Sequence, residues 1–164
     1  APYDMEIPPC GFIRGRGAEL MDWTLGELKP YVDRIYPTIP FREATGVGGS
    51  SMGGLMALFT VLRYNCWFSK AACLSSFRFC FDQLLEEAEG TEVNADTRVY
   101  LSWGSAECAT KASLASATDL NLTFSRILTR KGARTYPYLH VGGAHCEADW
   151  EQEVPRFMDY LWRE

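Results

Sequence analysis

The most reactive arrangement in this sequence is a serine with a glycine two positions away on each side. Gly49-x-Ser51-x-Gly53 follows a strand-like segment at residues 44–48 and precedes an amphipathic helical segment. A serine on a sharp strand-to-helix turn holds its hydroxyl above the sheet, where free N–H groups of the helix can bind a negatively charged oxygen. The motif predicts a nucleophilic serine, with the backbone N–H of Met52 as one oxyanion donor. A glycine-rich turn that only joins a strand to a helix is the alternative.

A serine hydroxyl becomes a good nucleophile only when a base accepts its proton and an acid orients that base. His145 follows a strand-like segment at residues 135–141, and Glu107 follows another at residues 97–103. Because the carboxyl ends of parallel strands lie on one rim of a sheet, we expect both side chains near Ser51. The chain order serine, acid, histidine is that of α/β-hydrolases.

Other side chains fit these roles less well. His140 lies inside a predicted strand and is expected to be structural, Asp119 lies inside a predicted helix, and Asp149 lies beyond the histidine. Cys146 directly follows His145, but adjacent side chains generally point apart, which argues against a cysteine nucleophile.

Strand-like and helical segments alternate along the chain, which predicts an α/β fold with a mostly parallel sheet flanked by helices. The predicted strands are residues 44–48, 68–76, 97–103 and 135–141, and the predicted helices are residues 18–35, 55–63, 84–87, 114–131 and 150–161. Small, uncharged residues at 44–48 favour a buried central strand packed on both faces. Pro30 should kink or break the first helix, and residues 1–17, rich in proline and glycine, should form a loop-rich segment.

Length and composition limit the number of domains and the kinds of partner that are possible. The 164 residues suffice for a single domain with a real core, residues 1–164. A net charge of −5 without a Lys/Arg cluster argues against nucleic acid as a partner. No apolar run is long enough to span a membrane, and the N-terminus lacks a basic-then-apolar signal, so we expect no membrane partner.

Cysteine and histidine usage bears on metals and on location. Six cysteines at low density, without a C-x-x-C pair, favour free thiols and a reducing compartment, with the cytoplasm favoured and the location left open. With only two histidines we expect no metal site, and the predicted chemistry needs no organic cofactor.

Four blocks of this sequence resemble the esterase D-like branch of the α/β-hydrolases, which includes feruloyl and acetyl-xylan esterases, S-formylglutathione hydrolases and siderophore esterases. The blocks are ELKPYV at 27–32, GVGGSSMGG at 46–54, VYLSWGSAE at 99–107 and GGAHCEADW at 142–150. The resemblance covers about residues 18–163, and its serine block with the helix before it is the most specific part. It implies an α/β-hydrolase-like fold and a serine esterase activity.

Carried over by position, the resemblance implies Ser51 as nucleophile, Glu107 as acid, His145 as base and Met52 N–H as oxyanion donor. The family commonly has Asp where this chain has Glu107, so the carboxylate would approach from one methylene further away. The family also has several strands before the first helix, including the loop that supplies a second oxyanion N–H. We therefore expect an N-terminally shortened hydrolase: a fragment, a naturally short enzyme, or one completed by a second subunit.

An uncovered sheet edge favours association, so we expect a homo-oligomer that covers the shortened sheet. The predicted function is a serine carboxylic-ester hydrolase that acts through an acyl-enzyme on a small or aromatic acyl ester. Phe77, in an aromatic cluster after the second strand, and Trp150 are expected to contact this small-molecule substrate. An acyltransferase with the same triad and a non-catalytic binding or assembly module are the alternatives.

Overall fold

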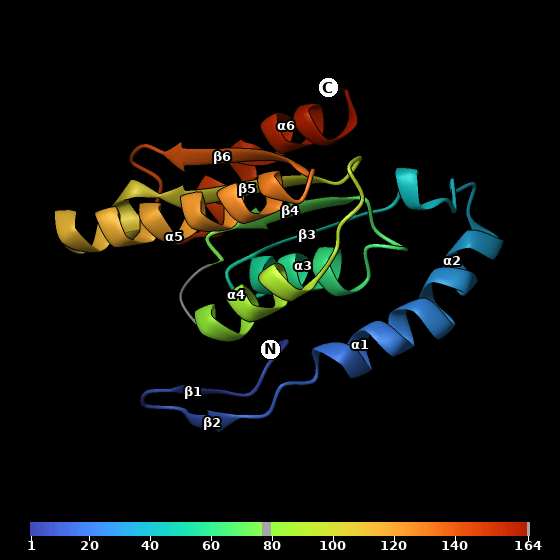
Figure 1. Cartoon of the computed structure of the whole chain (residues 1–164), viewed down its shortest axis with the longest axis horizontal. Helices are drawn as coiled ribbons and strands as arrows, with labels where there is room; N and C mark the ends of the chain where they lie inside the picture. The colour runs from blue at the N-terminus through green and yellow to red at the C-terminus, as the bar shows by residue number, and fades with distance from the viewer. Residues whose placement is uncertain (77–79, 164) are drawn as a thin grey trace.

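Four parallel strands form one sheet, in the order in which they occur along the chain (Figure 1). They are β3 (Gly46–Ser50), β4 (Lys70–Leu74), β5 (Arg98–Gly104) and β6 (Arg134–His140). The computed structural model describes residues 1–76 and 80–163. Neighbouring strands are linked by the crossover helices α3 (Met52–Arg63), α4 (Phe81–Gly90) and α5 (Lys111–Arg130). The prediction of a parallel α/β sheet flanked by helices is confirmed.

The two faces of the sheet carry separate cores. Helices α3, α4 and α5 pack on one face, and α6 (Glu147–Trp162) packs on the other (Figure 1). Side chains of β4 alternate between them: Ala71 and Cys73 belong to the first core, and Ala72 and Leu74 belong to the second. This period of two, in a strand buried on both faces, fixes the register of the sheet and hence which residues reach its rim.

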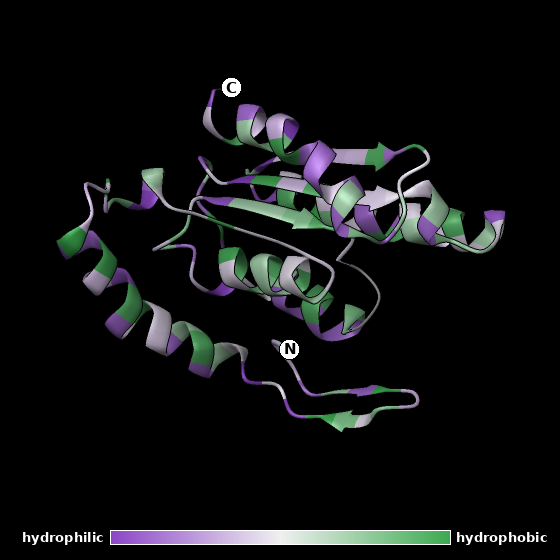
Figure 2. Ribbon diagram, turned by 180° about the vertical axis from the view of Figure 1, so that it is seen from behind, coloured by the Kyte–Doolittle hydropathy of each residue, from purple (hydrophilic) through white to green (hydrophobic). Residues whose placement is uncertain are grey.

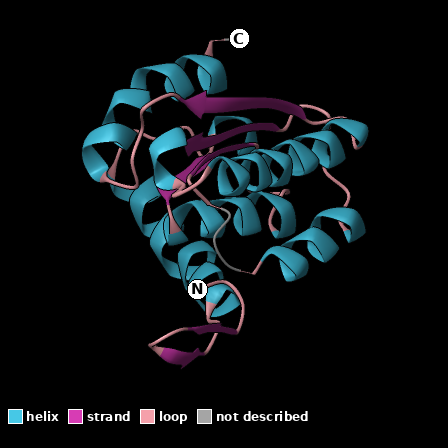
Figure 3. Cartoon of the chain, turned by 90° about the vertical axis from the view of Figure 1, so that its left-hand side faces the viewer, coloured by secondary structure: helices cyan, strands magenta, loops and turns pink. Residues whose placement is uncertain are grey.

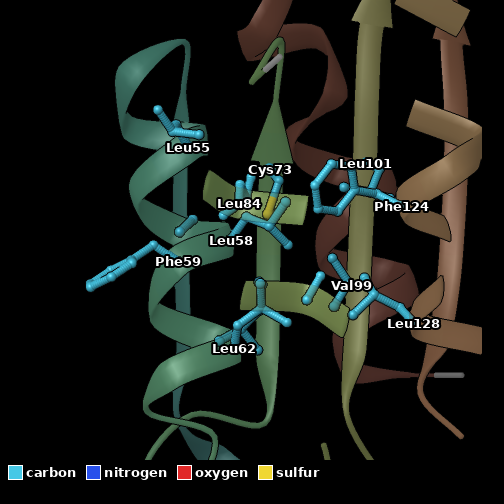
Figure 4. Packing of buried hydrophobic residues seen from close by; sticks show 14 of the residues in the cluster. Leu55, Leu58, Phe59, Leu62, Cys73, Leu84, Val99, Leu101, Phe124 and Leu128 are labelled. Atoms are coloured by element: carbon cyan, nitrogen blue, oxygen red, sulfur yellow. The ribbon is translucent and has the colours of Figure 1, made fainter. Parts of the chain in front are cut away.

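Helix α3 anchors the first core. Leu55, Leu58 and Leu62 each retain 1% exposure or less and belong to the core that α3 forms where it packs on β3 and β4 (Figure 4). Because the helix starts one residue after Ser51, its packing against the sheet also fixes the position of the predicted nucleophile.

β3 is an edge strand of the sheet, since within residues 1–76 and 80–163 it pairs only with β4. Gly46 and Gly48 are exposed and Val47 is half-buried, so the prediction of a buried central strand over residues 44–48 is wrong. Glycine has no side chain that reports whether a strand is covered, so a small-residue segment fits an edge as well as a centre.

Residues 17–35 form one helical segment with an internal change of winding. α1 (Gly17–Trp23) passes into a five-residue π-helical turn, Thr24–Leu28, and then into α2 (Lys29–Ile35). Pro30 lacks an N–H and its ring crowds the preceding turn, so the wider π turn relieves that clash. The regular α-helix is interrupted close to Pro30, as the proline predicted, but the segment stays helical on both sides of the interruption.

Hydrophobic and hydrophilic residues alternate along this segment (Figure 2), and several of its apolar side chains are exposed. The large ones are Leu20, Trp23, Leu28, Tyr31 and Ile35. Because soluble monomers rarely expose a large contiguous apolar patch, this face and the open edge of β3 favour a covering partner. Self-association stays a prediction.

The N-terminal residues contain a hairpin that the sequence did not indicate. β1 (Met5–Ile7) pairs antiparallel with β2 (Gly11–Ile13), apart from the main sheet (Figure 3). Met5 is 7% exposed and packs into the first core. Three-residue strands are too short to show a period of two, which is why residues 1–17 read as loop.

In the part of the chain that the structure describes, no helix is long and apolar enough to cross a membrane.

Shortening a buried leucine of α3 should destabilise the fold. We expect Leu58→Ala to lower the free energy of unfolding by about 3–5 kcal/mol, because it leaves a cavity between α3 and the sheet. Leu122→Ala, at a 36% exposed position of α5, is the matched control and should change it by less than about 1 kcal/mol. Urea unfolding followed by circular dichroism measures both. Equal losses in the two variants would contradict the assignment of the core.

Candidate active site

Ser51 lies on a strained turn between β3 and α3. Its φ of 54° and ψ of −119° lie outside the regions that residues with a side chain normally adopt. The backbone holds it there from both sides: Ser51 N–H donates to Leu74 O at 2.8 Å, and Ser51 O accepts from Leu55 N–H at 3.0 Å. Backbone strain of this kind costs about 1–3 kcal/mol and persists only where surrounding contacts impose it.

The glycines around Ser51 have unequal structural roles. A Cβ on Gly49 would lie 2.6 Å from the backbone carbon of Gly53, and a Cβ on Gly54 would lie 2.4 Å from Ser76 Oγ. A Cβ on Gly53 would meet no described atom within 4 Å. Close packing therefore requires Gly49 and Gly54, whereas the sequence motif points to Gly49 and Gly53.

Three side chains meet at the carboxyl-end rim of the sheet. Ser51 Oγ lies 2.8 Å from His145 Nε2, and His145 Nδ1 lies 2.7 Å from Glu107 Oε2. The Glu107 side chain is 9% exposed and that of His145 is 24% exposed, so the chain of hydrogen bonds is largely shielded from water. Ser51 follows β3, Glu107 follows β5 and His145 follows β6, so the residues come from three of the four strand ends, and the structure brings them together.

Glu107 is held by its own turn and by a neighbouring strand. It ends a short 3₁₀ turn after β5, Ser105–Glu107. Its Oε1 accepts the N–H of Gly104 at 2.7 Å and the hydroxyl of Ser75 at 2.6 Å. The carboxylate thus uses one oxygen to fix its position and the other to bind His145.

The loop that carries His145 is tied to the acid loop. Gly142 N–H donates to Ser105 Oγ at 2.8 Å, and Ala106 N–H donates to Gly143 O at 2.9 Å. These bonds fix the spacing between the two loops, and so the distance between acid and base.

The two rival aspartates have other partners. Asp149 Oδ2 accepts the N–H of Ala144 at 2.7 Å, and this bond lowers the pKa of the Asp149 carboxyl, with a smaller contribution from the Cys146 thiol. Asp149 therefore stabilises the histidine loop without contacting the ring nitrogens of His145. Asp119 is exposed and lies 3.5 Å from Arg126.

The second histidine lies in a different environment. His140 Nδ1 is 3.3 Å from Glu153 Oε1, and Glu153 also accepts the hydroxyl of Tyr100 at 2.8 Å. Burial, and next the bond to Glu153, raise the pKa of Tyr100 well above its usual range. This cluster ties α6 to the sheet.

Trp150 contacts the predicted base, His145, and also Ser75, which is bound to Glu107. Its ring meets that of His145 edge-on, with centroids 4.9 Å apart, and its indole N–H donates to Ser75 Oγ at 2.9 Å. Contact with a substrate stays a prediction for Trp150. Phe77 lies outside the described residues.

Sequence reasoning missed Ser75. In the structure it follows β4 directly, whereas the predicted strand at residues 68–76 includes it, so the rule that chemistry collects at carboxyl strand ends did not point to it. A lone serine among small residues carries no spacing pattern, and only the structure identifies its partners.

The N-terminal end of α3 adjoins a cavity. The first N–H groups of a helix have no intrahelical acceptor, and Met52 is the first residue of α3. A cavity of about 580 Å³ is lined by Met52, Gly53 and Met56 of α3 and by Leu20 and Trp23 of the N-terminal helix, among others. The cavity therefore lies next to the first turn of α3, the turn that directly follows Ser51.

Among the described residues, no group of three or more His, Cys, Asp or Glu side chains is arranged to hold a metal ion. All six cysteines are free.

The fold, with a strained serine before a helix and a histidine and acid on the same rim, is that of an α/β-hydrolase. The family model described as "Putative esterase" matches residues 19–158, and the chain belongs to this esterase family. No curated protein matches the chain significantly.

Solved structures show the same fold. A ferulic acid esterase matches with a TM-score of 0.70 at 15% identity, over 87% of this chain and 60% of that one. The BES protein from Bacillus cereus matches with a TM-score of 0.74 at 18% identity, over 90% and 56% of the two chains. The enterobactin esterase from Shigella flexneri, solved in the presence of enterobactin, matches with a TM-score of 0.72 at 24% identity, over 89% and 37%. This chain thus spans 60% or less of the length of each of these three.

The glycines after Ser51 differ in the space available for a Cβ, and this difference gives a prediction about stability. Gly54→Ala should lower the free energy of unfolding by about 2 kcal/mol or more, because its Cβ would lie 2.6 Å from the backbone oxygen of Leu74 and force a shift. Gly53→Ala, also inside α3, should be neutral or stabilising by up to about 1 kcal/mol, since alanine favours a helix. Urea unfolding compares them, and a larger loss for Gly53→Ala would contradict the assignment.

Proposed function

We propose that this chain is a serine carboxylic-ester hydrolase that works through an acyl-enzyme on Ser51. Membership of the esterase family supports ester hydrolysis. The hydrogen-bonded order Ser51 Oγ, His145 Nε2, His145 Nδ1, Glu107 Oε2, with both links under 2.9 Å, is the single observation that supports this mechanism.

Each residue of the triad has a distinct part in the reaction. His145 Nε2 takes the proton of Ser51 as Oγ attacks the ester carbonyl, then gives that proton to the leaving alcohol. In the second half His145 takes a proton from water, the hydroxide attacks the acyl carbon, and Ser51 regains its proton. Glu107 keeps the Nδ1 proton of His145 directed toward itself and stabilises the imidazolium that forms in each half.

The negative charge of the tetrahedral intermediate falls near the start of α3. Met52 N–H and the positive end of the α3 dipole support oxyanion binding there. A single N–H is a weaker oxyanion site than two, and losing one donor typically costs about 100- to 1000-fold in turnover. We propose Met52 N–H as one donor.

The cavity next to the first turn of α3 supports the proposal of a small or aromatic acyl group. Its lining includes the apolar residues Leu20, Trp23, Met52 and Met56, together with the charged residues Arg16 and Glu19. Ferulic acid esterase and enterobactin esterase, named for aromatic acyl compounds, are among the structures of like fold and favour this substrate class.

A fluorophosphonate probe tests the nucleophile. We expect the probe to label the wild-type chain and not Ser51→Ala, because the probe reacts only with an activated serine. Ser50→Ala is the matched control: it removes the neighbouring hydroxyl and should keep the labelling. Mass spectrometry of the labelled protein measures the outcome, and a label that survives Ser51→Ala would refute the assignment.

Turnover of p-nitrophenyl acetate tests the acid. Glu107→Gln keeps the shape but cannot stabilise an imidazolium, so kcat should fall about 10³- to 10⁴-fold. Asp119→Asn removes a carboxylate away from the rim and should leave kcat within twofold. Equal rates for Glu107→Gln and wild type would refute the role of Glu107.

A further inference from the structure

One oxygen of Glu107 is bound by groups that take no direct part in the triad. Oε2 binds His145, whereas Oε1 accepts hydrogen bonds from Gly104 N–H and from Ser75 Oγ. Ser75 Oγ in turn lies 2.9 Å from the indole nitrogen of Trp150. A chain of hydrogen bonds therefore runs from Trp150 through Ser75 to the acid.

The chemistry of the groups fixes the direction of this chain. An indole N–H can only donate, so Trp150 donates to Ser75 Oγ. A carboxylate can only accept, so the hydroxyl proton of Ser75 is directed to Glu107 Oε1. The Trp150 bond uses a lone pair of Ser75 Oγ and so favours the rotamer in which that proton points at the acid.

The backbone of Ser75 is in an unfavourable conformation. Its φ is 53°, in the left-handed region, although it has a side chain. Its N–H donates to Ser102 O at 2.8 Å, and the residue is 5% exposed. Strained backbone persists only where the surrounding structure imposes it and is concentrated at active sites, so the conformation of Ser75 points to a functional role.

Glu107 has space into which it could turn away. A cavity of about 370 Å³ adjoins it, lined also by Ser75, Trp103, Cys108 and Asn121. A long side chain beside such a space loses rotamer freedom only if bonds hold it. Gly104 N–H supplies one bond from the turn itself, and Ser75 supplies the one that comes from another strand.

We propose that Ser75 and Trp150 are positioning residues that hold Glu107 in the rotamer that accepts the hydrogen bond from His145 Nδ1–H. Trp150 acts twice, through its N–H on Ser75 and through its ring edge against His145. This inference rests on the proposed function, because it assigns the two residues to the same triad. Neither of them exchanges a proton with the substrate.

Two substitutions each remove one link of the chain of hydrogen bonds that runs from Trp150 through Ser75 to Glu107. Ser75→Gly deletes the hydroxyl at a position where glycine relieves the backbone strain, and Trp150→Phe keeps an aromatic ring but deletes the N–H. Loss of alignment should lower kcat for p-nitrophenyl acetate roughly 10- to 100-fold and leave KM within twofold. The matched control is Ser76→Ala, since Ser76 Oγ is buried with no partner among the described residues. It should leave kcat within twofold.

A double substitution tests whether Ser75 acts through the acid. In a Glu107→Ala background, Ser75→Gly should change kcat by less than twofold, because the group that it positions is gone. A role in stability alone would instead lower activity by the same factor in both backgrounds. That result would overturn the proposal.

A spectroscopic measurement keeps the test independent of turnover. The sequence has two histidines, so histidine labelled with ¹⁵N gives two sets of ring signals, which His140→Gln assigns. The Nδ1 proton of His145 should give a low-field signal in the wild type that is lost or shifted upfield in both Ser75→Gly and Trp150→Phe.

If wild type lacks esterase activity but the signal shifts in these variants, the proposed function fails and the positioning role stands. If the signal and kcat of both variants match the wild type, the positioning role is refuted while the esterase function stands. Circular dichroism checks that each variant is folded; if Ser75→Gly is not, Trp150→Phe decides alone.

Discussion

The hydrogen bond between His145 and Glu107 requires two loops to pass very close to each other, and Gly104 allows this approach. A Cβ on Gly104 would lie 2.2 Å from Gly143 O, and a Cβ on Gly143 would lie 2.6 Å from the ring of His140 at the end of its own strand, so Gly143 allows the turn after β6. Neither contact is possible for a residue with a side chain. The close passage lets Ala106 N–H bond to Gly143 O, so the acid and base are spaced by backbone rather than by flexible side chains. The loops that end β5 and β6 thus form one rigid unit.

Two residues at the rim of the sheet, Ser51 and Ser75, have strained backbone conformations that the packing of the core must stabilise. Ser51 and Ser75 both have positive φ, and they follow neighbouring strands that are joined by the bond from Ser51 N–H to Leu74 O. Each such residue costs about 1–3 kcal/mol, so the packing beneath must impose both conformations. Leu55 and Leu58, each 1% exposed or less, belong to the core that packs α3 against the sheet. Stability and site geometry are therefore coupled at the start of α3.

Much of this arrangement could be predicted because parallel strands obey one rule. Ser51, Glu107 and His145 each follow a strand-like segment, and parallel strands end on a common rim, so their meeting needed no knowledge of side-chain packing. Ser75 obeys the same rule, but a single serine has no spacing that distinguishes it from a surface residue. The environment of β3 was predicted wrongly because glycine does not record which neighbours a strand has. The interruption before Pro30 was predictable, since a missing N–H acts locally, whereas the hairpin in residues 1–17 depends on contacts of Met5 with the distant core.

The use of glutamate at position 107 has a physical explanation in the turn that carries it. The acid ends a 3₁₀ turn directly after β5, and Oε1 folds back onto the N–H of Gly104 at the start of that turn. The extra methylene gives the carboxylate enough length to do this while Oε2 still reaches His145 at 2.7 Å. A carboxylate with 9% exposure has lost most of its hydration, and it is stable only if protein donors replace the water. The backbone of its own turn, the hydroxyl of Ser75 and the ring of His145 are those donors. Glutamate therefore satisfies in one residue both the capping of the turn and the orientation of the histidine.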